Sequence, residues 1–429
     1  MNNSELAIFG GTKSISQQFK RYNPIGKEET EAALKVLKTG KLSPFLGQWK
    51  IDTEFGGFYG GEKVQEFERL TEREFNVKHA VTVNSATSGL VIAIGAAGIS
   101  PGDEVIVSPW TMCASATAIL FWNAIPVFAD IEDETFNIDP ISIRKNITEY
   151  SKAIVVPDIM GHPALLDEIL EIASEYNLVV IEDCSQSPKA RYKEKFAGTV
   201  GHIGVLSLNY HKHIHTGEGG ICLTDDSSLA ERMQLIRNHG EAVVEKKGVK
   251  DLTNMIGFNF RLGEIEAAIG IEQFKKMDSL ISDRINKANQ LKDGLTNLKG
   301  LRLPIVKDRC THVYYNFPLL VDEDELGCSR DAVFNALVSE GVPIGSGYFN
   351  LYLLPMYQNK IAYGSKGFPW VPEIYKGKVK YNKGICPVAE ELNNKIMGIG
   401  MCLYEYSNEE IDSIIFAFKK VWSNLDSLR

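Results

Sequence analysis

The chain has 429 residues, of which 44% are hydrophobic and 24% are charged, and its formal net charge is −9. This balance is typical of a large soluble globular protein, and an acidic chain without a long basic block is a poor candidate for nucleic-acid or anionic-membrane binding. Apolar runs are too short to span a bilayer, and Met1–Glu5 lacks the pattern of a secretory signal, so we expect a cytoplasmic protein. Seven cysteines without CxxC spacing indicate reduced thiols.

Between residues 79 and 224, short β-rich runs alternate with helical patterns. Strands are predicted over 79–83, 104–108, 126–130, 153–157, 178–183, 204–209 and 220–224, and helices over 88–97, 114–121 and 165–176. Such alternation predicts an α/β fold, with a mostly parallel sheet flanked by helices. Ligands of these sheets bind at the carboxyl ends of the strands, and several polar segments of this chain fall there.

The second half of the chain predicts a long helix over 262–298, followed by a strand over 313–320 and helices over 329–340 and 408–423. We place a large domain at 1–285 and a small α+β domain at 286–429. The segment Thr39–Gly61 is rich in glycine and aromatic residues, including Trp49 and Phe55, and is predicted to be a long, functional loop.

Two residues are the strongest chemical signal. Asp183 ends an apolar run, and Lys212 lies in the turn Ser207–Gly220 that follows the next strand. Pyridoxal 5'-phosphate needs this pair, because a lysine forms a Schiff base with its aldehyde and a carboxylate keeps its pyridine nitrogen protonated. The alternatives are a helix cap or turn for the aspartate and a solvated surface position for the lysine. Burial beside the cofactor cation is expected to lower the pKa of Lys212.

Two weaker patterns accompany this pair. Small residues in Asn84–Gly89 come between a strand and a helix, where backbone N–H groups and the helix N-terminus form a phosphate cup, although ordinary helix caps look the same. His211, His213 and His215 alternate and would share one face of an extended segment. Since no Asp, Glu or Cys ligand set accompanies them, we predict no metal site there.

The chain resembles the DegT/DnrJ/StrS family of aminotransferases, which belong to fold type I of the pyridoxal-phosphate enzymes and mostly aminate keto sugars. The resemblance extends over nearly the whole chain. It rests on Leu6–Gly11, the phosphate segment before Gly102–Val105, Val127–Asp130, Phe136–Asp139, Gly161–Pro163, Glu182–Gln186, the Lys212 turn, Arg237–Gly240, Gly257–Arg261 and Cys386–Glu390.

The resemblance implies a role for each matching residue. Lys212 would bind the cofactor and transfer protons, Asp183 would hold the pyridine nitrogen, and Gln186 would pack near the ring. The phosphate would be bound by Thr87, Ser88 and Ser207, and by Asn259 of a second subunit, which makes the active unit a homodimer with shared sites. The family often has an aromatic residue on the cofactor face where this chain has Met112, so Trp110 is a further candidate for stacking.

The implied activity is transfer of an amino group from glutamate or glutamine to a nucleotide-linked keto sugar. The aminated sugar would be used in the biosynthesis of a surface polysaccharide or natural product. Relatives with histidine in place of the lysine act as dehydratases, and retention of Lys212 favours amino transfer. Other acceptors also agree with the sequence: an inosose, a sugar acid, or a small phosphorylated ketone such as dihydroxyacetone phosphate. A non-catalytic regulatory homologue and a cofactor-free binding protein are the alternatives of another class.

Overall fold

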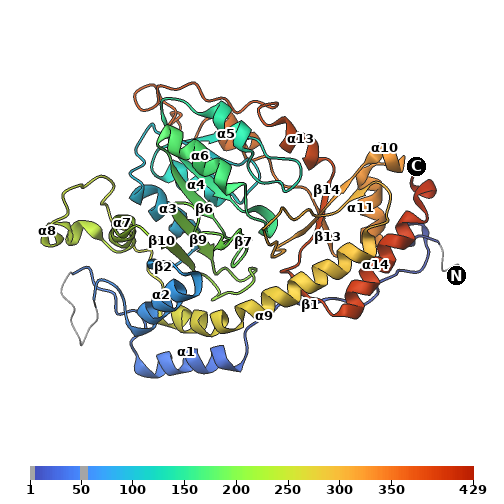
Figure 1. Cartoon of the computed structure of the whole chain (residues 1–429), viewed down its shortest axis with the longest axis horizontal. Helices are drawn as coiled ribbons and strands as arrows, with labels where there is room; N and C mark the ends of the chain where they lie inside the picture. The colour runs from blue at the N-terminus through green and yellow to red at the C-terminus, as the bar shows by residue number, and fades with distance from the viewer. Residues whose placement is uncertain (1–4, 49–56) are drawn as a thin grey trace.

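The computed structural model describes residues 5–48 and 57–429, so Trp49 and Phe55 lie outside the described part of the chain. Its centre is a seven-stranded sheet of order β2-β10-β9-β6-β5-β3-β4 (Figure 1). These strands are β2 (His79–Val83), β3 (Glu104–Val107), β4 (Ile125–Phe128), β5 (Ser151–Pro157), β6 (Val179–Asp183), β9 (Ile203–Ser207) and β10 (Gly220–Thr224). Strand β10 is antiparallel to both neighbours, and the pairs β4-β3, β3-β5, β5-β6 and β6-β9 are parallel. The predicted fold class is confirmed.

Helices cover both faces of this sheet, because successive strand residues point to opposite sides. Val105 and Val107 pack into the core shared with α3, α4 and α7, whereas Ile106 packs with α5 and α6. These helices are α3 (Ala86–Ala96), α4 (Cys113–Phe121), α5 (Pro140–Asn146), α6 (Leu166–Tyr176) and α7 (Ser227–Arg237). The helices α5 and α7 were not predicted. Helix α3 is almost entirely apolar, and it is buried because the sheet and other helices enclose it.

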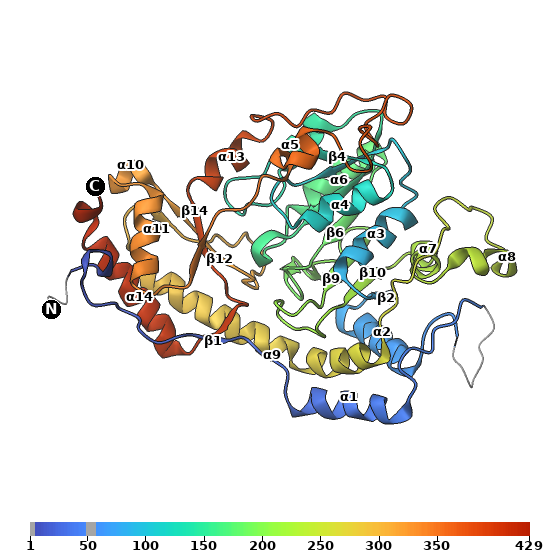
Figure 2. The same ribbon diagram turned by 180° about the vertical axis from the view of Figure 1, so that it is seen from behind.

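The long helix α9 (Glu264–Leu295) runs along one side of the molecule from the large sheet to the C-terminal region (Figures 1 and 2). Its first half packs against α1 (Lys27–Thr39) and α2 (Glu62–Phe75), and its second half packs against α14 (Asn408–Trp422). The predicted domain boundary near residue 285 falls inside this continuous helix, and it stays a prediction.

The C-terminal region forms a second core around a four-stranded antiparallel sheet of order β11-β12-β14-β13. Its elements are β11 (Leu301–Arg302), β12 (Phe317–Val321), β13 (Ile344–Ser346), β14 (Ile396–Ile399), α10 (Glu323–Leu326), α11 (Arg330–Ser339), α12 (Pro355–Gln358) and α13 (Pro387–Asn393). The buried side chains of Leu6 and Ile15 join this core. The N-terminal segment also pairs with it, through β1 (Lys20–Arg21) and β15 (Tyr404–Glu405).

The strand predicted over 313–320 was wrong at its start, because Tyr314 has a left-handed φ of 51° that interrupts extended structure before β12 begins. The remaining short pieces are α8 (Val244–Lys247) and the hairpin β7 (Arg191–Tyr192) and β8 (Lys195–Phe196). In the described part of the chain, no helix has both the length and the hydropathy that crossing a membrane requires.

Candidate active site

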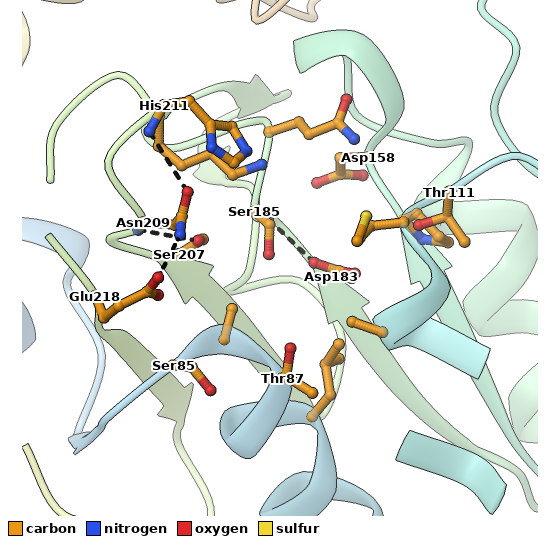
Figure 3. Close-up of a pocket in the computed structure, with 17 residues that line it drawn as sticks. Ser85, Thr87, Thr111, Asp158, Asp183, Ser185, Ser207, Asn209, His211 and Glu218 are labelled. Atoms are coloured by element: carbon orange, nitrogen blue, oxygen red, sulfur yellow. Dashed lines mark hydrogen bonds between the residues drawn. The ribbon is translucent and has the colours of Figure 1, made fainter. Parts of the chain in front are cut away.

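One cavity lies at the carboxyl ends of the parallel strands and brings together segments far apart in the sequence. Residues from the ends of β5, β6 and β9, from the segments that follow these strands, and from the starts of α3 and α4 line it (Figure 3). Six of the predicted site residues line this cavity: Lys212, Asp183, Gln186, Thr87, Ser207 and Met112. Sequence reasoning therefore located the cavity correctly through the strand-end rule.

Asp183 is buried at the end of β6 and is held by two donors. Its Oδ2 accepts a hydrogen bond of 2.7 Å from Ser115 Oγ, and its Oδ1 accepts one of 3.2 Å from the backbone N–H of Ser185. A buried carboxylate with these partners still has unused acceptor capacity, so it suits a cationic ligand such as a protonated pyridine nitrogen.

Lys212 is buried in the turn that follows β9, and its backbone N–H donates to Asn209 O over 3.0 Å. Burial lowers the pKa of the Lys212 ammonium to about 8, while the charge of Asp183 acts in the opposite direction. An amine with this pKa is partly neutral near physiological pH, so it can react with a carbonyl group.

The start of α3 forms the predicted cup. Ser85 caps the helix by accepting from the Ser88 N–H over 3.1 Å. In the described part of the chain, no acceptor is bonded to the backbone N–H groups of Ala86 and Thr87. A Cβ on Gly220 would lie 2.7 Å from the Ala86 nitrogen, so glycine is needed where β10 passes under the cup. Free N–H groups at a helix N-terminus fit a phosphate.

The Ser88 hydroxyl does not line the cavity, because it donates to Asn84 Oδ1 over 2.7 Å. Asn259 is also away from the cavity of its own chain, and its Oδ1 accepts from Arg261 Nε over 2.8 Å. Trp110 is fully buried beneath the cavity, where its Nε1 donates to Asn350 Oδ1 over 2.8 Å. Stacking by Trp110 on a cavity ligand is therefore not supported by this geometry.

Met112 occupies the rim of the cavity instead, and its side chain is strongly exposed. Gln186 lies deeper, where its Oε1 accepts from the Met160 N–H over 2.7 Å and its Nε2 donates to Tyr348 over 3.2 Å. Tyr348 in turn stacks on Trp110 with ring centroids 6.0 Å apart. Gln186 is thus held in a fixed orientation, and Trp110 supports it indirectly.

The three alternating histidines do not share a face, because residues 210–214 form a turn and not an extended segment. His211 lines the cavity, whereas His213 is fully buried and its Nε2 pairs with Val313 O at 2.9 Å. His215 Nδ1 accepts from the Gly217 N–H over 3.3 Å.

Sequence reasoning missed Asp158, Ser115 and Tyr315. Asp158 follows β5 directly, so the rule that found Asp183 was sufficient to find it. Burial and the neighbouring Glu182 raise the pKa of Asp158 to about 8. Ser115 lies one helical turn after Thr111, a spacing that only the structure connects to Asp183. Tyr315 comes from the segment just before β12, and no local pattern indicates it.

Comparison with known proteins agrees with this geometry. Residues 53–380 match the model of the DegT/DnrJ/EryC1/StrS aminotransferase family. The chain belongs to this family. Its enzymes are pyridoxal-phosphate-dependent aminotransferases, so the predicted family, enzyme class and cofactor are confirmed.

Two curated relatives and one solved structure illustrate the relationship. The GDP-perosamine synthase of Escherichia coli O157:H7 is 33% identical over 322 residues, which cover 75% of this chain and 85% of the relative. A putative L-glutamine:3-amino-2,3-dideoxy-scyllo-inosose aminotransferase of Streptoalloteichus tenebrarius is 29% identical and covers 99% of this chain and 100% of the relative. The solved aminotransferase of Psychrobacter cryohalolentis superposes with a TM-score of 0.80 and 28% identity, over 95% of this chain and 100% of that one.

Proposed function

We propose that this family member transfers an amino group from glutamate or glutamine to the carbonyl carbon of a keto sugar. The convergence of Asp183 and Lys212 on one cavity carries the proposal. Bound pyridoxal phosphate supplies an electron sink that stabilises a carbanion on the amino donor. Everything else must come from the chain, which has to orient the donor and move protons.

Each residue then has a specific task. Asp183 holds the ring nitrogen, with Ser115 and the Ser185 N–H fixing its carboxylate. Lys212 would hold the cofactor through its aldehyde, and its amine would move the proton at the reacting carbon; its pKa of about 8 is matched to that work. Gln186 would lie beside the cofactor ring, and Met112 is exposed where it lines the cavity.

The phosphate end of the cavity is formed by α3 and β9. Thr87 and Ser207 line the cavity there, and Ser88 completes the first turn of α3. We further propose that Asn259 acts on the cofactor of a second subunit, because it lies outside the cavity of its own chain. The exposed side chains of Met112, Tyr210 and Ile256 support burial of this side by a second copy.

For the acceptor, we propose a nucleotide-linked keto sugar, in agreement with the similarity to GDP-perosamine synthase. A cyclic polyol ketone is the second candidate, and a specific observation favours it. The inosose aminotransferase aligns with 99% of this chain, whereas the perosamine synthase aligns with 75%. The extra length of this chain is thus shared with the inosose enzyme.

Visible absorption of the cofactor-loaded protein tests the function. Glutamate or glutamine is expected to shift the band to shorter wavelength, and the true acceptor is expected to restore it. Nucleotide diphosphates inhibit the reaction if the acceptor is nucleotide-linked, and they do not if it is an inosose or dihydroxyacetone phosphate. A protein that binds the cofactor but shows no band shift with either donor would support the non-catalytic alternative.

A further inference from the structure

The amine of Lys212 lies over an aromatic ring, and the sequence pattern around Lys212 gives no indication of this ring. Lys212 Nζ is 4.3 Å from the centroid of the Tyr315 ring. Lys212 is buried and Tyr315 is partly exposed, and Tyr315 also lines a second cavity between β13, β14 and residues 400–404. A cation over the face of an aromatic ring is attracted by the ring quadrupole.

Tyr315 is placed there by the interruption before β12. The left-handed backbone at Tyr314 turns the chain, and the Asn316 N–H is then fixed by a hydrogen bond of 3.2 Å to Met160 O. The ring of Tyr314 stacks on His312 at 3.9 Å and points elsewhere. The turn before β12 thus presents one tyrosine to the amine and its neighbour to the core.

Several titratable groups surround the amine. Burial lowers the pKa of Lys212, and Asp183 from β6 and Cys402 from the segment after β14 act in the opposite direction. The rings of His211 and His213 each lie 6.4 Å from the Tyr315 ring. Burial raises the pKa of the Tyr315 phenol far above neutrality, so the ring carries no charge of its own.

We propose that Tyr315 is a positioning residue that holds the released ammonium group of Lys212 on its ring face while a substrate occupies the cofactor. This inference rests on the proposed aminotransferase function. A carboxylate at this position would form an ion pair and keep the amine protonated. A neutral ring holds the cation more weakly, so Lys212 stays close to the reacting carbon and can still release its proton.

The test compares Tyr315→Leu, which removes the ring, with Tyr315→Phe, which keeps the ring and removes the hydroxyl. In the cofactor-free protein, trace acetylation of Lys212 with acetic anhydride is followed by mass spectrometry of its peptide across the pH range. We expect Tyr315→Leu to lower the pKa of Lys212 by about half a unit to one unit, and Tyr315→Phe to leave it unchanged. If Tyr315→Leu does not fold, Tyr315→Met is measured in its place.

In the loaded enzyme, the single-turnover rate with the amino donor is expected to fall about tenfold in the ring-less variant, with little change in the phenylalanine variant. An unchanged Lys212 pKa without the ring overturns the proposal. So does an equal shift in Tyr315→Phe, since that would assign the effect to the hydroxyl. The acetylation measurement requires no turnover, so the two proposals can fail separately. If the pKa of Lys212 shifts in Tyr315→Leu but the loaded wild-type protein does not react with any amino donor, the aminotransferase function is rejected and the Lys212–Tyr315 contact is still supported.

Discussion

Ser115 Oγ donates a hydrogen bond of 2.7 Å to Asp183 Oδ2, and the Thr111 hydroxyl lies 2.8 Å from the same Ser115 oxygen. All three side chains are buried, so the relay joins the start of α4 to the end of β6 without intervening solvent. Hydrogen bonds to a carboxylate stabilise its charged form. The relay therefore holds the Asp183 carboxylate in a fixed orientation, as binding of a pyridinium nitrogen requires.

Replacing Ser115 with alanine removes this donor. A hydrogen bond to a buried charge contributes about 1.5–3 kcal/mol, so we expect cofactor affinity and kcat/KM to fall roughly tenfold to a hundredfold. Spectroscopic titration with pyridoxal phosphate and steady-state kinetics measure the two effects. Ser142→Ala, which removes a buried serine hydroxyl bonded to the Asp130 N–H, is the control. An equal loss in both variants would contradict a specific role for Ser115.

Lys212→Ala is expected to abolish turnover without lowering stability. Removing the amine eliminates proton transfer, which accelerates such reactions by about 10²–10⁴-fold. It also removes a cation that burial disfavours, so the melting temperature should be equal to or higher than that of the wild type. Amine production and calorimetry measure both properties, with the exposed Lys195→Ala as the control. Wild-type turnover in Lys212→Ala would reject the assignment.

Asp158 makes stability depend on pH. Its pKa is raised from 3.8 to about 8, so the folded protein retains a proton that the unfolded chain loses. The contribution of this carboxyl to stability is therefore present at low pH and is lost as the pH rises towards 8. Asp158→Asn keeps acceptor and donor groups for the Ala164 N–H and the Ser187 hydroxyl but does not titrate. Its melting temperature relative to the wild type should rise between pH 5 and 8 and level off above 8.

The buried histidines affect the pH dependence of stability in the opposite direction, because they destabilise the fold at low pH. Burial lowers the pKa of His162 to about 4, and the pKa values of His213 and His312 also lie well below 6.5. The unfolded chain takes up protons on these rings first, so stability falls as the pH drops below about 6.5. His162→Gln should reduce this slope by close to one proton near pH 5 and by about half a proton at pH 6.5, as measured by denaturant unfolding between pH 5 and 7. An unchanged slope would show that His162 is charged in the folded state.

Local sequence patterns were sufficient to predict the sheet and the position of the cavity. The runs ending at Val83, Asp183 and Ser207 are apolar and lie between turn signals, so each was identified from its own residues. The strand-end rule then brought Asp183, Lys212 and Thr87 to one place without any knowledge of distances.

Features that depend on tertiary contact were out of reach of the sequence. The indole of Trp110 points into the core because Asn350, 240 residues away, accepts its hydrogen bond. Tyr315 reaches Lys212 only because the chain turns at Tyr314, 102 residues away in the sequence. Strand-like composition likewise extended the predicted strand back to Val313, since propensity does not anticipate the left-handed backbone of Tyr314.

A mixed-dimer experiment tests the shared site. If Asn259 acts on the cofactor of a second subunit, Lys212→Ala in one subunit and Asn259→Ala in the other damage the same site of a mixed dimer. One site then has alanine at both positions, and the other is intact. Random assembly makes about half of the dimers mixed, so an equimolar mixture of two inactive variants should recover about a quarter of the wild-type activity. The variants are unfolded and refolded together, and each refolded alone is the control. No recovery from a mixture that contains mixed dimers, as shown by native mass spectrometry, would place the action of Asn259 within its own chain.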